Sequence, residues 1–405
     1  MKLLFFRYNS IFEPDCIEAF KYLGLEIAQL NISDYENTEK ASVAVADLYL
    51  KEKNNNTPFL FVFSINFFPV ISDLCQKLGV LYVCWSVDCP VNELLFNQIK
   101  NPCNRIFLFD HAQYLRFERY NPGNIFYLPL GTNVDRLQKT VAAITESDKK
   151  RFTHDICFIG SLYGEKNPLK DLSLSEHTKG FIDGLKTAQM SVFGCNFIEQ
   201  ALTQEVIEDI KGSSLSKSNE GFVASLDRYV VAHSYIGMDL AETERKHILN
   251  ELSKDHSVAI YTLSDTSDLP NVQNMGPANT LNEMPKIFNL SKINLNITMR
   301  PIETGLSLRV YDVLGSGGFL ITNYQAEIPE IFQPDEDIVL YESIPDLLGK
   351  IDYYLKLKEK CNYYLTHEDE RRQIAINGYE KTLKFHTCRQ RITTMFSLLT
   401  GGQHE

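Results

Sequence analysis

Short apolar runs alternate with longer amphipathic stretches through the first half of this chain. The apolar runs are rich in β-branched and aromatic residues, which favours strands. Six of them predict strands, at residues 2–7, 25–30, 59–63, 80–85, 106–109 and 125–128. Helical patterns occupy residues 14–23, 69–78 and 112–118. Strands separated by helices predict a parallel, doubly wound α/β sheet.

The second half starts a new sheet after a charged break. Residues 145–151, TESDKKR, interrupt the hydrophobic pattern, and we expect a domain boundary there. Further strands are predicted at residues 155–159, 257–262, 293–297, 319–322 and 338–340. Residues 196–252 have a helical pattern without strand signals, so they predict a helical insertion in the second domain.

The length of the chain sets the expected number of domains. At 405 residues it is too long for one ordinary domain, and two domains of about 150–200 residues are the natural expectation. We expect an N-terminal Rossmann-like domain over residues 1–150 and a second over residues 151–385. A C-terminal helix is expected within residues 386–405.

Residues 291–341 carry the clearest site signal in the chain. The strand predicted at residues 293–297 is followed by an irregular segment with Arg300, then by a helix-length segment with Arg309 and Asp312. Glycines end this helix, and the next strand completes a βαβ crossover. Two arginines and a carboxylate therefore meet at the carboxyl end of a parallel strand. Open α/β sheets bind ligands there, and a helix N-terminus favours phosphate.

Several segments together form a recognisable pattern. They are INLNITMR and LRVYDVLGSGGFLITNYQAE in this region, and FFRYNSIFEPDCIEAFKYLG, YLPLGTNVDRL and DICFIGSLYG earlier in the chain. In combination they resemble the CgeB-type proteins of the group 1 glycosyltransferases. The resemblance implies the GT-B fold, in which two Rossmann-like domains face a cleft that takes a sugar nucleotide. It also implies an acceptor on the first domain, a donor on the second, and a last helix that crosses back to the first.

By this resemblance, Asp312 matches the second acidic residue of the family's E-x7-E motif, which binds the ribose. Arg309 lies three residues earlier on the same helix face, and we expect it to hold the diphosphate. The alternative is an internal salt bridge between the two side chains on a solvated helix face. Thr304 occupies the first acidic position, with Glu303 one residue away. This departure leaves the donor sugar and the retaining or inverting outcome open.

Further donor-side candidates follow other predicted strand ends of the second domain. Arg300 is a second phosphate candidate, and the alternative is an ordinary surface arginine. At Gly160 the backbone can approach a diphosphate. In related enzymes this turn carries an arginine and a lysine; here Ser161 replaces the arginine, and Lys166 is the candidate lysine. The full set is Gly160, Ser161, Tyr163, Lys166, Thr262, Arg300 and Tyr324.

Polar residues after the strands of the first domain are candidates for the acceptor side. Asp88, His111 and Glu13 each follow a predicted strand. An acceptor hydroxyl must lose its proton to a carboxylate or imidazole within hydrogen-bond reach, so we expect a general base among these three. The alternative for each is a local role at a helix start.

Composition excludes several partners and cofactors. The net charge of −12 argues against nucleic acid. The nine cysteines form no CxxC pair, which favours a reducing cytoplasm. We expect no signal peptide and no membrane span. The sequence lacks metal-ligand spacings, a GxGxxG motif after the first strand and a Walker loop. We therefore expect neither a metal nor a bound cofactor.

These observations predict a cytoplasmic, metal-independent glycosyltransferase of the hexosyltransferase class. It would move a sugar from a nucleotide-sugar donor to a soluble acceptor, either a protein side chain or a glycan. One alternative is a sugar-nucleotide epimerase on the same fold. Another is a catalytically degenerate GT-B protein that acts in spore or surface assembly, since a fold alone does not establish activity.

Overall fold

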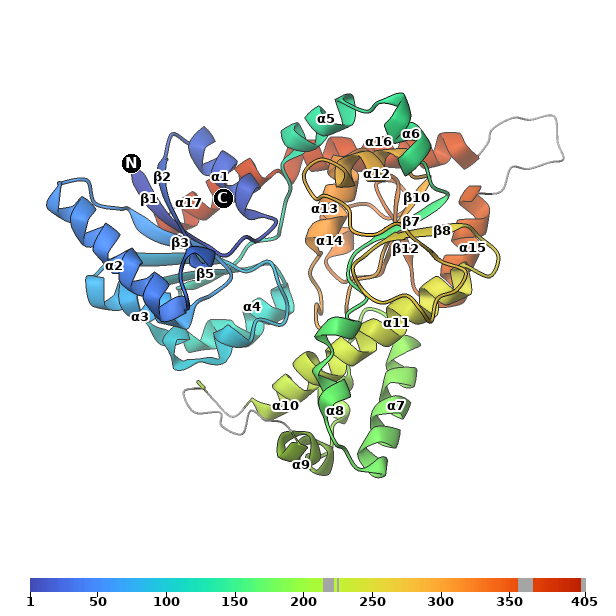
Figure 1. Cartoon of the computed structure of the whole chain (residues 1–405), viewed down its shortest axis with the longest axis horizontal. Coiled ribbons are helices and arrows are strands. Elements are labelled where there is room, and N and C mark those ends of the chain that lie inside the picture. The colour runs from blue at the N-terminus through green and yellow to red at the C-terminus, as the bar shows by residue number, and fades with distance from the viewer. Residues whose placement is uncertain (214–221, 224–225, 356–366, 402–405) are drawn as a thin grey trace. The chain divides into compact units, whose positions relative to one another are not determined.

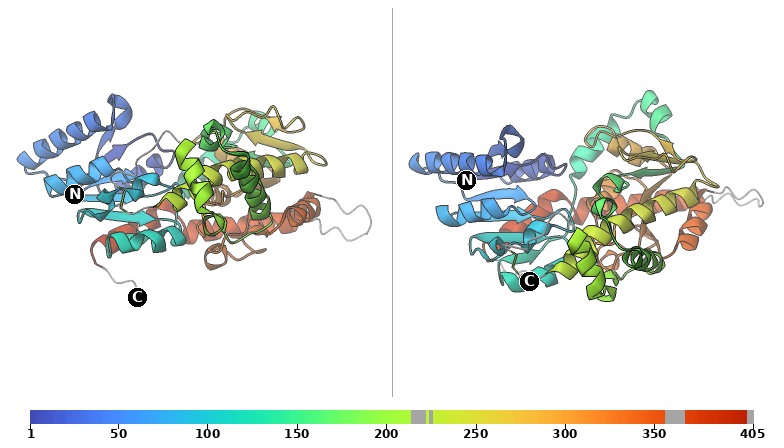
Figure 2. Two further views of the ribbon diagram at one scale, coloured as in Figure 1. Left: turned by 90° about the horizontal axis from the view of Figure 1, so that it is seen from below. Right: turned by 60° about the horizontal axis from the view of Figure 1, so that its bottom comes forward.

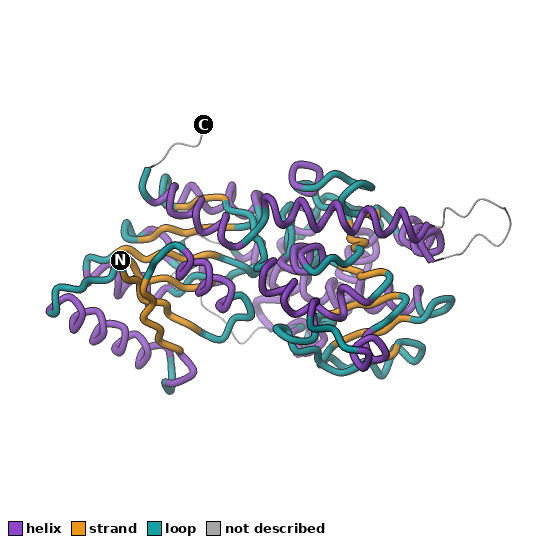
Figure 3. The backbone as a smooth tube through the Cα atoms, turned by 90° about the horizontal axis from the view of Figure 1, so that it is seen from above, coloured by secondary structure: helices purple, strands orange, loops and turns teal. Residues whose placement is uncertain are grey.

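The computed structural model describes residues 1–213, 222–223, 226–355 and 367–401. The chain divides into two units, each with one six-stranded parallel sheet (Figures 1 and 2). Unit 1 holds Met1–Gly131 and the described parts of Asn219–Leu226 and Thr387–Glu405. Unit 2 holds the described parts of Thr132–Ser218 and Asp227–His386. In both units the strands lie between helices (Figure 3), which confirms the predicted pair of doubly wound parallel sheets.

The sheet of unit 1 has the strand order β2-β1-β3-β4-β5-β6, with every neighbouring pair parallel. Its strands are β1 (Lys2–Arg7), β2 (Glu26–Asn31), β3 (Phe61–Ile65), β4 (Leu81–Trp85), β5 (Asn104–Leu108) and β6 (Ile125–Tyr127). Its α-helices are α1 (Glu13–Tyr22), α2 (Thr38–Asn54), α3 (Pro69–Leu78), α4 (His111–Phe117) and α17 (Cys388–Leu399). The central strand β3 is buried along its whole length, because helices cover both faces of such a sheet.

The last helix, α17, packs against the first, α1 (Figure 1). Arg389 of α17 pairs with Glu18 of α1 at 2.8 Å. The rings of Phe396 and Phe20 lie 6.3 Å apart, edge to face. The C-terminal helix therefore belongs to unit 1, although the chain immediately before it, Asp227–His386, belongs to unit 2.

The sheet of unit 2 has the strand order β12-β11-β10-β7-β8-β9, again parallel throughout. Its strands are β7 (Ile156–Ile159), β8 (Val258–Tyr261), β9 (Gln273–Asn274), β10 (Ile293–Asn296), β11 (Leu320–Asn323) and β12 (Val339–Tyr341). The helices outside the β7–β8 connection are α5 (Val134–Ala142), α6 (Glu146–Phe152), α12 (Met284–Leu290), α13 (Leu308–Gly315), α14 (Ile328–Ile331), α15 (Ile344–Leu355) and α16 (His367–Phe385).

The long connection between β7 and β8 is mainly helical in its described part. Its α-helices are α7 (Glu176–Met190), α8 (Ile198–Ala201), α9 (Gln204–Ser213), α10 (Asp227–Val230) and α11 (Gly237–Leu252). Helices α7, α8, α9 and α11 share a separate apolar cluster that includes Ile182, Ile207 and Leu240. The insertion predicted at residues 196–252 lies within this region, which begins one long helix earlier, at α7. Residues 214–221 and 224–225 of the predicted insertion fall outside the described residues.

The charged stretch at residues 145–151 is a helix, α6, and not a linker. Thr145 accepts a hydrogen bond from the Asp148 N–H, and the Asp148 side chain accepts one from the Thr145 N–H, forming a capping box. The two units divide earlier, between Gly131 and Thr132, whereas the pattern of the sequence placed the boundary after residue 150.

Strand order fixes where each sheet can bind a ligand. In unit 1 the connections from β1 and β2 run in opposite directions, so the topological switch point lies between β1 and β3. In unit 2 it lies between β7 and β10. Ligands of open α/β sheets bind at the carboxyl ends of the strands beside such points.

Candidate functional site

The loops that follow β7 and β10 are joined by Arg245 of α11. Its Nη1 donates to the carbonyl oxygen of Ser161 at 2.5 Å, and its Nη2 donates to that of Ile297 at 2.6 Å. Its guanidinium carbon lies 4.6 Å from the centre of the Tyr163 ring, within cation–π range. Arg245 therefore fixes the switch point of unit 2. Arg245 could not be recognised from the sequence, because the run ETERKHIL has the composition of a solvated helix face.

The turn after β7 is held by hydrogen bonds within itself. Ser161 Oγ accepts from the Tyr163 N–H at 2.8 Å and donates to Glu165 Oε1 at 2.6 Å. Tyr163 has a φ of 68°, a left-handed conformation that is uncommon for a residue with a side chain. Lys166 is exposed, with Nζ 5.7 Å from the centre of the Tyr163 ring. Two predicted donor-side residues, Tyr163 and Lys166, thus present a ring and a cation at this edge.

Gly160, where the diphosphate was expected to approach the backbone, packs against protein side chains. A Cβ atom there would lie 3.3 Å from the Phe158 ring and 3.7 Å from Nη1 of Arg245. The Gly160 N–H donates to the Tyr261 carbonyl oxygen at 3.2 Å. Close packing at the end of β7 therefore explains this glycine without a ligand.

Thr262 and Tyr324 are also engaged by neighbouring parts of unit 2. Thr262 Oγ1 accepts from the Ser264 N–H at 3.0 Å, and Ser264 Oγ accepts from the Leu162 N–H at 2.8 Å. These bonds join the loop after β8 to the turn after β7. The Tyr324 ring packs so closely on Gly194 that a Cβ atom there would lie 2.8 Å away. Both residues shape the carboxyl edge of the sheet.

Ser307 lies immediately before α13, where a side chain commonly caps the helix. It makes no capping hydrogen bond, and its buried Oγ has no hydrogen-bond partner among the described residues. Leaving a buried hydroxyl unsatisfied is unfavourable by about 1–3 kcal/mol, so such atoms usually have a partner. The N-terminus of a helix also favours anions. The unpartnered hydroxyl and the helix terminus together fit an anionic ligand.

Arg309 lies in the first turn of α13. Its Nη1 lies 2.9 Å from Met284 Sδ and 3.8 Å from Asp312 Oδ2, and its guanidinium packs on the Phe288 ring. Burial lowers the pKa of Arg309, and the Asp312 carboxylate opposes this shift. The positive charge of Arg245 lowers the pKa of Arg309 further. Arginine keeps its charge at neutral pH even so, and Arg309 adds a positive charge in the first turn of α13, which Ser307 precedes.

Asp312 is directed into unit 2. Its side chain is 6% exposed, and Oδ1 accepts from Thr132 Oγ1 at 2.8 Å. The predicted proximity of Arg309 and Asp312 is present. The pair is internal, as in the alternative, but it does not lie on a solvated helix face, because the Asp312 side chain is buried. The ribose-binding role of Asp312 stays a prediction, because its carboxylate is largely occupied within the protein.

Arg300 forms a buried ion pair. Its Nη2 lies 2.5 Å from Glu244 Oε1 and its Nε 3.1 Å from Oε2, while Nη1 donates to the Val192 carbonyl oxygen at 2.8 Å. All three guanidinium nitrogens are used by the protein. Arg300 is therefore neither the surface arginine of the alternative nor an open phosphate ligand in this structure.

The first acidic position of the family motif has a local role. Thr304 Oγ1 donates to Glu327 Oε1 at 2.6 Å, and the Glu327 N–H donates to the Thr304 carbonyl oxygen at 3.2 Å. Glu303 is partly exposed, and its carboxylate lies 4.0 Å from Nε2 of the buried His233. Thr304 thus fixes the loop after β10, and Glu303 is the nearby carboxylate.

In unit 1, three polar residues meet at the carboxyl ends of β1, β3 and β4. Asn66 Nδ2 lies 2.9 Å from the Tyr8 hydroxyl oxygen and donates to Asp88 Oδ2 at 2.6 Å. Burial and the Asp88 charge raise the pKa of Tyr8, so this hydroxyl stays protonated. Asp88 is exposed and held in place beside the switch point. Sequence reasoning identified Asp88 but missed Tyr8 and Asn66.

The other two acceptor-side candidates differ in accessibility. Glu13 is fully buried, where it accepts from Arg7 Nε and from the Tyr8 N–H, both at 2.8 Å. These bonds join Glu13 to the end of β1, so its carboxylate is used within unit 1. His111 begins α4, is exposed, and lies with its ring 5.0 Å from that of Tyr127. Asp88 and His111 thus remain the accessible candidates for a base.

The described part of the chain contains neither a metal-binding cluster nor a membrane-spanning helix. There, no group of three or more histidine, cysteine, aspartate or glutamate side chains is placed to hold a metal ion. No helix among the described residues is both long and apolar enough to cross a bilayer. Metal independence stays a prediction.

Residues 245–397 match the family model described as glycosyl transferase-like. The match begins at Arg245, the residue that joins the loops of the switch point. No curated protein matches the sequence. The narrower resemblance to CgeB-type proteins therefore stays a prediction.

Solved structures show the same fold over nearly the whole chain. A glycosyltransferase from Rickettsia africae has a TM-score of 0.55 at 11% identity, covering 99% of this chain and 98% of that one. Anabaena HepE in complex with UDP-glucose has a TM-score of 0.55 at 9% identity, covering 99% and 100%. A UDP-forming trehalose-phosphate synthase from Burkholderia xenovorans has a TM-score of 0.53 at 11% identity, covering 100% and 99%. The chain thus has the GT-B fold, with a glycosyl transferase-like domain over residues 245–397.

Proposed function

We propose that this chain is a glycosyltransferase whose nucleotide-sugar donor binds at the carboxyl edge of the unit 2 sheet. The unpartnered Ser307 hydroxyl at the start of α13, beside Arg309, carries this proposal. A donor diphosphate would accept hydrogen bonds from Ser307 Oγ and from N–H groups of the first turn, with Arg309 opposing its charge. The family match and the UDP-glucose complex of HepE support a nucleotide sugar as donor.

The proposed reaction is transfer of the sugar to an acceptor hydroxyl. The bond between the anomeric carbon and the diphosphate oxygen breaks, and the nucleoside diphosphate leaves with the electron pair. The acceptor oxygen bonds to the anomeric carbon, and its proton passes to a base. Asp88 is the proposed base, because it is exposed and Asn66 orients it. The α13 terminus and Arg309 stabilise the charge that grows on the leaving group.

Three finer features belong to the proposal. We expect the donor to carry a hexose, and we expect no requirement for a metal ion, because Arg309 and a helix terminus can oppose the diphosphate charge. We expect a protein side chain or a glycan as acceptor, in the cytoplasm. The net charge of −12 supports a soluble acceptor over one in an anionic membrane.

A second candidate is a nucleotide-binding protein that has lost turnover. Two observations favour it. Asp312 accepts a hydrogen bond from Thr132, and Arg300 forms an ion pair with Glu244. Two residues that were expected to bind the donor therefore have partners within the protein. Such a protein would keep the GT-B fold and bind a nucleotide without transferring a sugar.

Turnover of the full chain distinguishes the two candidates. The protein is incubated with a panel of UDP-, GDP- and ADP-sugars, and release of the nucleoside diphosphate is measured with and without EDTA. Release from one donor, retained in EDTA and lost in Asp88→Asn, is the expected result. Nucleotide binding without release from any donor, with candidate protein or glycan acceptors present, would favour the second candidate.

A further inference from the structure

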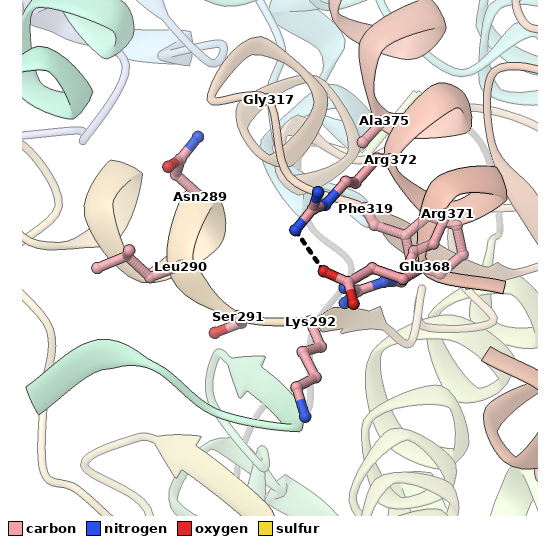
Figure 4. Close-up of a pocket in the computed structure, with 10 residues that line it drawn as sticks. All are labelled: Asn289, Leu290, Ser291, Lys292, Gly317, Phe319, Glu368, Arg371, Arg372 and Ala375. Carbon is pink, nitrogen blue, oxygen red and sulfur yellow. Dashed lines mark hydrogen bonds and ion pairs between the residues drawn. The ribbon is translucent and has the colours of Figure 1, made fainter. Parts of the chain in front are cut away.

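Unit 2 has an open cavity at the edge of its sheet opposite to the proposed donor site. Its volume is about 290 Å³. One wall consists of residues 289–292, which end α12 and precede β10, and another of Gly317 and Phe319, which precede β11. Strands β10 and β11 are parallel, so this is the amino edge of the sheet. The third wall is the first part of α16 (Figure 4).

Basic side chains line this cavity. Lys292, Arg371 and Arg372 contribute positive charges, against one lining carboxylate, Glu368. Arg372 pairs with Glu368, and Lys292 pairs with Asp155 at 2.7 Å. Figure 4 shows Arg371 and Arg372 on one helix, across from Asn289. The cavity therefore contains a third cation beyond its two ion pairs.

Arg371 is the third cation, and one of its guanidinium nitrogens has no hydrogen-bond partner in the described protein. Its Nε is buried and has no hydrogen-bond partner among the described residues. Within the same residues, no ion pair to Arg371 is present. Burial lowers the pKa of Arg371, and the Glu368 charge only partly opposes this. A buried guanidinium nitrogen without a hydrogen-bond partner is unfavourable, and an anion that accepts from Nε would relieve this.

The size and lining of the cavity indicate more than a bare inorganic anion. Its volume of about 290 Å³ leaves room for far more than one water molecule. Phe319, Leu290 and Ala375 provide apolar surface beside the cations. This combination suits a small organic molecule with a phosphate group that faces Arg371.

We propose that this cavity binds a phosphate monoester of a small metabolite, at a second site separate from the donor site. The phosphate accepts hydrogen bonds from Arg371, with Arg372 and Lys292 adding positive charge around it. The organic part lies against Phe319 and Leu290. This site does not depend on the proposed glycosyltransferase activity, because it uses other residues at the other edge of the sheet.

The test is calorimetric titration of the full chain, at low ionic strength, with glucose 6-phosphate, UMP and inorganic phosphate. Saturable binding of at least one of the two monoesters is expected. The affinity of the Arg371→Gln variant for that monoester should fall about tenfold or more, because a charge-assisted hydrogen bond is lost. Lys384→Gln is the matched control: it removes one positive charge from the exposed far part of α16, outside the cavity, and should bind as the unchanged protein does.

The two monoesters distinguish a sugar phosphate from a nucleotide at this site. UMP binding that is lost in Ser307→Ala but kept in Arg371→Gln would belong to the donor site and would not support the second site. Equal affinities in Arg371→Gln and the unchanged protein, or binding of inorganic phosphate alone, would overturn the proposal. Circular dichroism of each variant confirms that the fold is intact, so that a lost affinity reports on the cavity.

Discussion

Arg300 and Glu244 are buried partners inside unit 2, with side chains 5% and 4% exposed. Removing one member of such a pair leaves an uncompensated buried charge. We predict that Arg300→Met lowers the free energy of unfolding by about 3–5 kcal/mol, measured by urea denaturation. The double variant Arg300→Met, Glu244→Leu should recover most of this loss, because neither charge then remains buried.

Lys350 provides the matched comparison for Arg300. It pairs with Asp346 at 2.9 Å, and both side chains are about one third exposed. Lys350→Met should therefore change stability by less than about 1 kcal/mol. If Arg300→Met is no more destabilising than Lys350→Met but abolishes nucleotide binding, Arg300 is a ligand of the donor and its assignment as a structural residue fails.

Ser307 and Ser316 lie at opposite ends of α13 and should respond differently to alanine. Ser307 Oγ has no hydrogen-bond partner among the described residues, whereas Ser316 Oγ donates to the Asp312 carbonyl oxygen at 2.7 Å. We predict that Ser307→Ala weakens nucleoside diphosphate binding by about 2 kcal/mol, the scale of a hydrogen bond to a charged group. Its stability should not fall, because no internal bond is lost.

Ser316→Ala should show the opposite behaviour, with stability lowered by about 1 kcal/mol and nucleotide affinity unchanged. Calorimetric titration and urea denaturation of both variants provide the comparison. A Ser307→Ala protein that is less stable and binds nucleotide normally would identify Ser307 as an ordinary structural residue.

At the residue scale, sequence reasoning worked where the partners are close in the chain. The i, i+3 spacing of Arg309 and Asp312 predicted their proximity, and Arg309 Nη1 lies 3.8 Å from Asp312 Oδ2. It failed where the partner is distant: Arg245 bonds to Ser161, 84 positions away. The composition around Arg245 contains no information about a contact that only the tertiary fold creates.

Helix α6 is joined to α12 by an ion pair between Asp148 and Lys286 at 2.9 Å. The Lys286 hydrogen bond, and then those from Thr145, lower the pKa of Asp148 from 3.8 to about 2. A lowered folded-state pKa adds stability that is present above the unfolded-state pKa and is lost as the pH falls through the folded-state value. The stabilising effect of Asp148 is therefore complete near neutral pH and disappears between about pH 4 and pH 2.

We predict that Asp148→Asn is less stable than the unchanged protein at pH 7, and that the difference shrinks towards zero near pH 2. Urea denaturation across this pH range measures it. Glu146→Gln, on the same helix but 82% exposed, should have a smaller effect at pH 7. A difference between Asp148→Asn and the unchanged protein that stays constant down to pH 2 would contradict the linkage.

At the element scale, apolar runs located the long strands because buried parallel strands are hydrophobic along their whole length. The two-residue strand β9 was missed because both of its residues are exposed. Helix α2 was missed as well, since only Ala41, Val45 and Tyr49 of its 17 residues are buried. The charged run that forms α6 was interpreted as a boundary because composition alone does not reveal a capping box.

The last helix completes unit 1 although it follows unit 2 in the chain. Ile392 of α17 is fully buried. We predict that Ile392→Ala destabilises unit 1 by about 2–5 kcal/mol and speeds proteolytic cleavage there, as mapped by mass spectrometry. Thr393 is the exposed neighbour of Ile392, and the Thr393→Ala variant should be cleaved at the same rate as the unchanged protein. Faster cleavage confined to unit 2 would show that α17 stabilises the other unit.

At the scale of the whole molecule, the alternation of strands and helices was sufficient to predict two doubly wound sheets. It was insufficient to place the division at Gly131, because α5 and α6 continue the helical pattern and belong to unit 2. The acceptor and the donor sugar were not predictable, since they depend on side chains brought together from distant parts of the chain.

In the proposed function, the donor nucleotide binds at the carboxyl edge of the unit 2 sheet. Hydrogen exchange of the full chain, with and without saturating UDP, tests this most directly. Protection is expected in residues 160–166 and 297–309, with residues 289–292 and 371–375 at the amino edge unchanged. Protection confined to unit 1 or to the amino edge of unit 2, with the carboxyl edge exchanging at its free rate, would contradict the account.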